Sequence, residues 1–278
     1  MPLNRSSAFR LLAAAGMAAL AFAAQSAPQG GASPAAVAAE VLPPAYARWQ
    51  SSMDAFAAAD RDQAPQAGGV LFVGSSTIRL WPDLREDFRQ LPVVINRGFG
   101  GSTMADCNYF VKSLVVQYRP RHVIVYAGDN DLAEGRSPAQ VLESFRSFVT
   151  AVRTALPDTR ISYISIKPSP LRSALLPQVR EANALLAGYL QSVPQSDYID
   201  IFTPMLTAAG EPRTDLYGPD RLHMNGAGYD LWQAVITHHL GASGNGAATL
   251  QAARGGEPRA AVATPVQPGG LMQVSAGR

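Results

Sequence analysis

The feature that most constrains the fold is an alternation of short apolar segments with amphipathic ones between residues 69 and 240. Five of the apolar segments combine β-branched and aromatic residues with high local hydrophobicity, which favours β-strands. These segments are residues 69–73, 92–95, 122–126, 161–166 and 197–201. Strands that are apolar along most of their length are typical of a parallel sheet covered on both faces.

The segments between these strands carry helix signals. Residues 137–140 combine an N-cap serine, a proline at the first helical position and a capping-box glutamine, and an apolar stripe follows. Further helices are expected over 177–192 and 227–240, with Asn225 as the N-cap of the second. Regular alternation of strands and helices with short loops predicts an α/β domain built on a doubly wound parallel sheet.

The N-terminal segment has the pattern of a secretory signal peptide over residues 1–27. Arg5 and Arg10 precede an apolar, alanine-rich run, and small residues follow it. The alternative is an N-terminal membrane anchor, but the run is shorter than the roughly 20 residues that a spanning helix needs. We therefore expect an exported protein, periplasmic or secreted, with no transmembrane span after removal of the signal.

The rest of the chain divides into a linker, one domain and a tail. Residues 28–43 are rich in Ala, Pro and Gly and are expected to be a linker; the domain spans 44–242. It begins with a helix over 46–60, which either packs on the domain or shields its site. Residues 243–278 hold many Gly, Ala and Pro residues, and we expect a disordered tail.

Composition excludes several classes of protein. A chain of 278 residues with 47% hydrophobic residues can bury one sizeable core. The formal net charge of +2 and the absence of a Lys/Arg run give no sign of nucleic-acid binding. Cys107 is the single cysteine, which excludes an intramolecular disulfide, and we expect it to be a small buried side chain. The oligomeric state is not indicated.

Polar segments follow the first three strands. Gly74-Ser75-Ser76 follows the first, a glycine-rich turn over 96–103 follows the second, and Gly128-Asp129-Asn130-Asp131 follows the third. Loops at the carboxyl ends of parallel strands border a common crevice, so these segments are expected to converge if the strand order is 2-1-3-4-5.

Ser76 is the better candidate nucleophile of the adjacent serines, because it lies at the start of a short helix that favours negative charge. The alternative is that Ser75 or Ser76 only caps that helix. Gly101 and the Asn130 side chain are candidate donors to an oxyanion, although both residues are also common in turns.

His223 is the candidate general base. Asp220 precedes it by three residues, a spacing that can place carboxylate and imidazole side by side across a turn. Of the other histidines, His122 opens a predicted strand, and His238 and His239 lie in the last predicted helix with no acidic residue close in sequence. Packing or surface positions are expected for all three.

These four segments, in this order, resemble the SGNH (GDSL-type) hydrolase family from about Val70 to Trp232. The resemblance implies a three-layer α/β/α sandwich with a five-stranded parallel sheet, flavodoxin-like in its winding. It also implies ester hydrolysis with Ser76 as nucleophile and Asp220 and His223 as its partners. By the same resemblance the oxyanion is held by the Ser76 and Gly101 N–H groups and the Asn130 amide.

One position departs from the family pattern. Ser75 stands where the family usually has an aspartate directly before the nucleophile, which affects the hydrogen bonding of the site. Arg97 and Lys167 also follow strands and are candidates for binding an anionic or sugar-bearing substrate, although ion-paired or solvated positions are the more common use of such residues.

The sequence therefore predicts an exported serine esterase that needs no metal or organic cofactor. The expected substrate is a small-molecule or glycan-borne short-chain O-acyl (acetyl) ester; a lysophospholipid or thioester is the alternative on the same site. Two other classes stay open. One is a metal-dependent phosphoesterase with Asp129, Asp131, Asp220 and His223 as ligands, and the other is a glycan- or lipid-binding protein without turnover.

Overall fold

The computed structural model describes residues 43–254, so the predicted signal peptide, nearly all of the predicted linker and residues 255–278 lie outside it. Its centre is a parallel sheet of five strands in the order β2-β1-β3-β4-β5, as the sequence predicted. The strands are β1 (Val70–Gly74), β2 (Val94–Gly98), β3 (His122–Tyr126), β4 (Arg160–Ile164) and β5 (Ser196–Ile199). β2 begins two residues later and ends three residues later than expected, and Arg97 within it pairs with Asp60.

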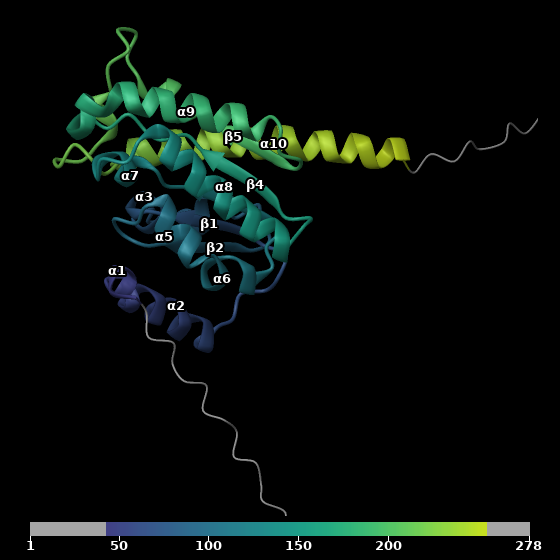
Figure 1. Cartoon of the computed structure of the whole chain (residues 1–278). Helices are drawn as coiled ribbons and strands as arrows, with labels where there is room; N and C mark the ends of the chain where they lie inside the picture. The colour runs from purple at the N-terminus through teal and green to yellow at the C-terminus, as the bar shows by residue number, and fades with distance from the viewer. Residues whose placement is uncertain (1–42, 255–278) are drawn as a thin grey trace, which may run out of the picture. The chain divides into compact units, whose positions relative to one another are not determined.

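Helices cover both faces of the sheet and give the three-layer α/β/α sandwich (Figure 1). One face is covered by α5 (Met104–Tyr109), α6 (Val111–Leu114), α8 (Pro138–Ala155) and α9 (Leu176–Leu190). The other is covered by α3 (Ser76–Arg79), α4 (Leu84–Asp87) and α10 (Gly226–Arg254). Shorter elements connect them: α7 (Asp129–Ala133) and the 3₁₀ turns η1 (Val116–Tyr118), η2 (Pro170–Leu175), η3 (Thr203–Met205) and η4 (Thr214–Leu216).

Two apolar clusters hold the layers together. Successive side chains of a strand point to opposite faces, so Leu71 and Val73 of β1 enter one cluster, whereas Val70 and Phe72 enter the other. Burying one such side chain contributes about 1.5–3 kcal/mol. Cys107 lies in the first cluster, fully buried as expected, and burial raises the pKa of its thiol far above the usual range.

The N-terminal helical segment packs on the first cluster. The sequence predicted one helix over 46–60, but the structure has α1 (Pro44–Ala47) and α2 (Gln50–Asp62). The chain bends between them at Trp49, whose ring meets Phe99 edge-on with centroids 5.3 Å apart. This contact fixes the start of α2 beside the loop that follows β2.

The predicted helix caps are present. Ser137 and Gln140 form the capping box of α8, and the Asn225 side chain accepts a hydrogen bond from the Gly228 N–H at 3.1 Å. α10 corrects one expectation, because it continues to Arg254 where a disordered tail was predicted from residue 243. Alanine is frequent in that stretch and has the highest helix propensity. None of the helices described has the length and hydropathy of a membrane span.

Candidate active site

The turn that carries the candidate nucleophile depends on Gly74, the last residue of β1. Its φ is +148°, and a Cβ there would lie 1.8 Å from the Tyr126 carbonyl oxygen, so a larger residue would separate β1 from β3. Ser75 follows as the N-cap position of α3, but its hydroxyl makes no capping bond and has no partner among residues 43–254. Ser76 is the first residue of α3. Neither serine therefore caps the helix through its side chain.

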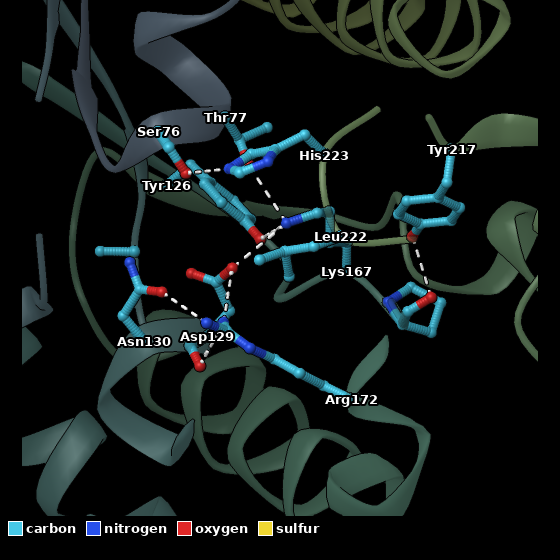
Figure 2. Close-up of polar contacts among 12 residues, drawn as sticks. Ser76, Thr77, Tyr126, Asp129, Asn130, Lys167, Arg172, Tyr217, Leu222 and His223 are labelled. Carbon is cyan, nitrogen blue, oxygen red and sulfur yellow. Dashed lines mark hydrogen bonds and ion pairs between the residues drawn. The ribbon is translucent and has the colours of Figure 1, made fainter. Parts of the chain in front are cut away.

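A tight turn brings His223 to Ser76. Asp220 Oδ1 accepts hydrogen bonds from the Leu222 and His223 backbone N–H groups, both at 3.0 Å, which closes the turn. Asp220 Oδ2 lies 2.6 Å from His223 Nδ1. His223 Nε2 lies 3.1 Å from Ser76 Oγ (Figure 2). The chain thus brings together three predicted residues that lie up to 147 positions apart in sequence.

The protonation of this set follows from Asp220. The Leu222 N–H, together with the His223 ring and N–H, lowers the pKa of the Asp220 carboxyl to about 2, so it is ionised at neutral pH. A carboxylate only accepts hydrogen bonds, so the proton of a neutral His223 ring is on Nδ1. The lone pair of Nε2 then faces the Ser76 hydroxyl, as a general base requires.

Three N–H donors belong to residues that line the same cleft, namely Ser76 itself, Gly101 and Asn130. Within the described residues, the backbone N–H groups of Ser76 and Gly101 have no hydrogen-bond partner; Gly101 has φ +73°. Asn130 Nδ2 donates to the Ser102 carbonyl at 3.0 Å, which leaves its second N–H available. Arg172 donates to Asn130 Oδ1 at 2.9 Å (Figure 2). Because arginine only donates, it fixes which end of the amide is oxygen.

A buried ion pair lies behind this site. Lys167 Nζ is 3.1 Å from each of Thr77 Oγ1, the Tyr126 hydroxyl and Asp129 Oδ2 (Figure 2). Burial favours the neutral acid, but Lys167 and then Arg172 outweigh it and lower the pKa of Asp129. The network ties the start of α3 to the segment that carries the Asn130 amide.

Arg97 and Lys167, the two cations considered for substrate binding, are therefore both buried and ion-paired. Arg97 contacts Asp60 and the Tyr118 hydroxyl and packs on the Phe56 ring. Neither side chain lines the cleft at Ser76.

The residues considered as metal ligands do not form one cluster. Asp131 accepts from the Met104 N–H with both oxygens, at 3.1 and 2.9 Å, and burial raises its pKa to about 6. Asp129 faces Lys167 and Arg172, whereas Asp220 faces His223. Among the residues described, no three or more His, Cys, Asp or Glu side chains are grouped to hold a metal ion.

Ser76 and His223 open into a cleft of about 540 Å³, which the candidate oxyanion donors Gly101 and Asn130 also line. Sequence reasoning missed several other residues of its wall: Arg48, Trp49, Ser52, Arg79 and Arg172. One of them had a signal, since Arg79 lies three residues after Ser76 and thus on the same side of its helix. Arg48 and Arg172 come from irregular segments whose position only the folded chain determines.

Comparison with solved structures supports the same fold. A GDSL-like lipase from Bacteroides thetaiotaomicron is 20% identical, with a TM-score of 0.60 over 69% of this chain and 98% of that one. An acetylxylan esterase from Geobacillus stearothermophilus, solved as a catalytic mutant, is 14% identical, with a TM-score of 0.53 over 63% and 95%. A lipase/acylhydrolase from Enterococcus faecalis is 19% identical, with a TM-score of 0.50 over 62% and 95%.

A search of curated proteins found no match. The model of the GDSL-like lipase/acylhydrolase family, in contrast, matches residues 66–231, more than half of the chain, and spans all four segments that carry the site. This chain belongs to the GDSL-like lipase/acylhydrolase family.

Proposed function

We propose that this chain is an exported serine esterase that hydrolyses short-chain O-acyl esters, acetyl esters above all. The observation that carries the proposal is the hydrogen-bonded series Asp220 Oδ2–His223 Nδ1 and His223 Nε2–Ser76 Oγ, at 2.6 and 3.1 Å. It opens onto a solvent-accessible cleft, where an ester can reach Ser76.

In the proposed first half-reaction, Ser76 Oγ attacks the ester carbonyl carbon while His223 Nε2 takes the hydroxyl proton. The N–H groups of Ser76 and Gly101 and the Asn130 amide stabilise the oxyanion of the tetrahedral intermediate. The C–O bond to the alcohol then breaks, and His223 gives its proton to the leaving oxygen. Asp220 stabilises the imidazolium in between.

In the second half-reaction, water attacks the acyl-enzyme carbonyl and gives its proton to His223 Nε2. The second tetrahedral intermediate uses the same three donors. It collapses to the free acid, and the proton returns to Ser76 Oγ. No metal or organic cofactor enters either half-reaction.

The preference for short acyl groups rests on the cleft. Its few apolar side chains are those of Trp49 and Leu222, whereas most of its wall is arginine, glycine and polar side chains. A long acyl chain would find little apolar surface there. The acetylxylan esterase among the structural neighbours points the same way, because acetyl is the shortest common acyl group.

The test is hydrolysis of p-nitrophenyl acetate and its longer acyl homologues by the mature protein, with and without EDTA, beside Ser76→Ala. We expect activity that falls with chain length, is lost in Ser76→Ala and ignores EDTA. A maximum at long chains would favour a lysophospholipase. EDTA-sensitive activity that survives in Ser76→Ala would favour the metal-dependent phosphoesterase. Saturable glycan or lipid binding without any turnover would favour the binding protein.

Export rests on residues 1–27 alone. Expression of the full chain in a bacterial host, followed by fractionation and N-terminal sequencing, tests it. We expect a mature N-terminus close to residue 28 in the periplasm or medium; an uncleaved chain in the membrane fraction would favour an N-terminal anchor.

A further inference from the structure

The charged wall of the cleft is entirely cationic. Arg48, Arg79 and Arg172 line it, together with His223, and no aspartate or glutamate does. Asp106 and Asp129, which pair with Arg48 and Arg172, are buried, whereas Glu134, 3.8 Å from Arg48, is 43% exposed. The residues that line the cleft itself offer an entering ester guanidinium groups and no carboxylate.

Two of the three guanidinium groups are already engaged. Arg48 lies 3.3 Å from Asp106 Oδ2 and stacks over the Trp49 ring at 4.7 Å from its centroid. Arg172 lies 3.3 Å from Asp129 Oδ2 and also binds the Asn130 amide oxygen. These two side chains are held in place by the protein itself.

Arg79 differs from both. Its side chain forms no hydrogen bond, ion pair or ring contact with any residue in the described range 43–254, and it is exposed at the cleft. Exposed arginines are common, but this one is on α3, three residues after Ser76, and so faces the same side of the helix.

The guanidinium of Arg79 lies against the loop after β2. A Cβ at position 100 would lie 2.8 Å from Arg79 Nε and 3.3 Å from Nη2, so the arginine would have to shift if this position carried a side chain. Gly100 therefore leaves the space in which the guanidinium lies. Its neighbour Gly101 carries one of the free N–H groups of the site, so the guanidinium is beside the groups that would hold the reacting carbonyl.

We propose that Arg79 binds an oxyanion carried by the substrate, so that the preferred ester bears a carboxylate or phosphate on its alcohol part. The inference rests on the proposed esterase function. The anion is assigned to the alcohol because a short acyl group leaves no room for a second functional group. Arginine suits this role because its planar donors match carboxylate and phosphate oxygens two at a time.

The test compares acetate esters that differ only in charge: those of 4-hydroxybenzoate, of 4-hydroxyphenyl phosphate and of the neutral 4-hydroxybenzamide. Each kcat/KM is divided by the rate of uncatalysed hydrolysis of the same ester, which removes differences between the leaving groups. The selectivity is this corrected kcat/KM for an anionic ester divided by that for the neutral ester. Because both values come from the same protein, a general loss of activity in a variant cancels.

We expect wild type to prefer an anionic ester by about tenfold, the effect of one charge-assisted hydrogen bond in a partly solvated site. The selectivity should fall to about one in Arg79→Gln, stay largely intact in Arg79→Lys, and decrease as salt is raised. Arg89→Gln, an exposed arginine outside the cleft, is the matched control and should keep it. Preference for only the phosphate or only the carboxylate ester identifies which oxyanion the site selects.

A wild-type selectivity of one, or an equal selectivity in Arg79→Gln, would overturn the inference while Ser76-dependent hydrolysis of the neutral ester still stood. If no ester is hydrolysed, a binding measurement still tests the anion site independently of the proposed esterase function. Calorimetric titration of Ser76→Ala with 4-hydroxybenzoate and 4-hydroxyphenyl phosphate should give a Kd about tenfold lower than titration of Ser76→Ala/Arg79→Gln. Equal Kd values would reject the anion site whatever the chemistry.

Discussion

The chain holds two hydrogen-bonded sets of serine, histidine and aspartate side chains, one at each end of the sheet. The carboxyl-end set is Ser76, His223 and Asp220. The amino-end set is Ser162, His122, Asp197 and His239. The residue types are the same, so residue type alone does not decide which set is arranged for proton transfer.

The two sets differ in which atoms donate and which accept their hydrogen bonds. In the amino-end set the Ser162 hydroxyl donates its one proton to Asp197 Oδ1. His122 Nε2 lies 2.7 Å from Ser162 Oγ and must therefore be the donor to that oxygen. A ring nitrogen that carries a proton cannot accept one from Ser162. In the carboxyl-end set the aspartate binds the far nitrogen of His223, and Nε2 is left as an acceptor.

Solvent access separates them as well. Ser162 is fully buried and His122 nearly so, under α10, whereas the His223 and Asp220 side chains are 33% and 51% exposed. Burial lowers the pKa of His122 to about 4 and keeps its ring neutral. Position at the carboxyl ends of the strands, with N–H donors nearby, therefore separates a set arranged for proton transfer from a structural one.

The largest loss of activity is expected when the candidate general base, His223, is substituted. His223→Ala should lower kcat/KM for p-nitrophenyl acetate by about 10³-fold or more, because among the described residues His223 is the base that contacts the Ser76 hydroxyl. His122→Gln keeps a donor toward Ser162 and is the matched variant of the amino-end set; its kcat/KM should stay within about threefold of wild type. A similar loss of kcat/KM in both variants would contradict the functional difference between the two sets.

Asn130→Ala should lower kcat by about 10²–10³-fold, with much less change in KM, because the amide acts on charge that develops in the transition state. Steady-state kinetics measures it. Asn108→Ala, a partly buried asparagine whose side chain makes no hydrogen bond among the described residues, is the control. A change in KM alone for Asn130→Ala would mean that the amide binds substrate and does not stabilise the oxyanion.

We expect the amino-end set to affect how the free energy of unfolding depends on pH. The folded-state pKa of His122, about 4, is below its ordinary value of about 6.5, so between these pH values the unfolded chain binds more protons. The contribution to stability is present above pH 6.5 and is lost as pH falls toward 4, by about 3 kcal/mol at most. Urea unfolding at pH 7, 5 and 4 measures it.

His122→Gln, which does not titrate, should show a shallower fall in stability over this range than wild type. Equal slopes would mean that other groups, not His122, set the acid sensitivity of this end of the sheet.

The smallest effect is expected at Ser75. Its hydroxyl is buried without a partner among the described residues, so Ser75→Ala should change the free energy of unfolding by less than about 1 kcal/mol, or stabilise the fold. Activity should remain within a few-fold of wild type. Urea unfolding and esterase assays measure both, and a large loss of either would show that the hydroxyl has a role that the hydrogen bonds do not reveal.

Sequence patterns predicted the sheet well because strands buried on both faces are nearly continuous runs of apolar residues, as in His122–Tyr126. The convergence of the three polar segments after the first three strands could be predicted because the carboxyl ends of parallel strands meet at one edge. Asp220 and His223 could be paired because three residues separate them.

What could not be predicted depends on contacts between distant segments. His239 had no acidic neighbour in sequence, yet Asp197 of β5 lies 2.9 Å away because α10 packs over that strand. The sequence indicated an ion-paired or solvated position as the more common use of Lys167, but it could not name Asp129 as the partner that the fold places against it. The end of α10 was missed because alanine-rich sequence is compatible with both helix and disorder.

The most direct test of the account is where an acyl-mimicking reagent reacts. A fluorophosphonate labels serines that a neighbouring base activates, and peptide mass spectrometry of the labelled mature protein locates the adduct. The account predicts a single adduct on Ser76, absent from His223→Ala and retained in His122→Gln. An adduct on Ser162, or none on Ser76 in the folded wild-type protein, would contradict it.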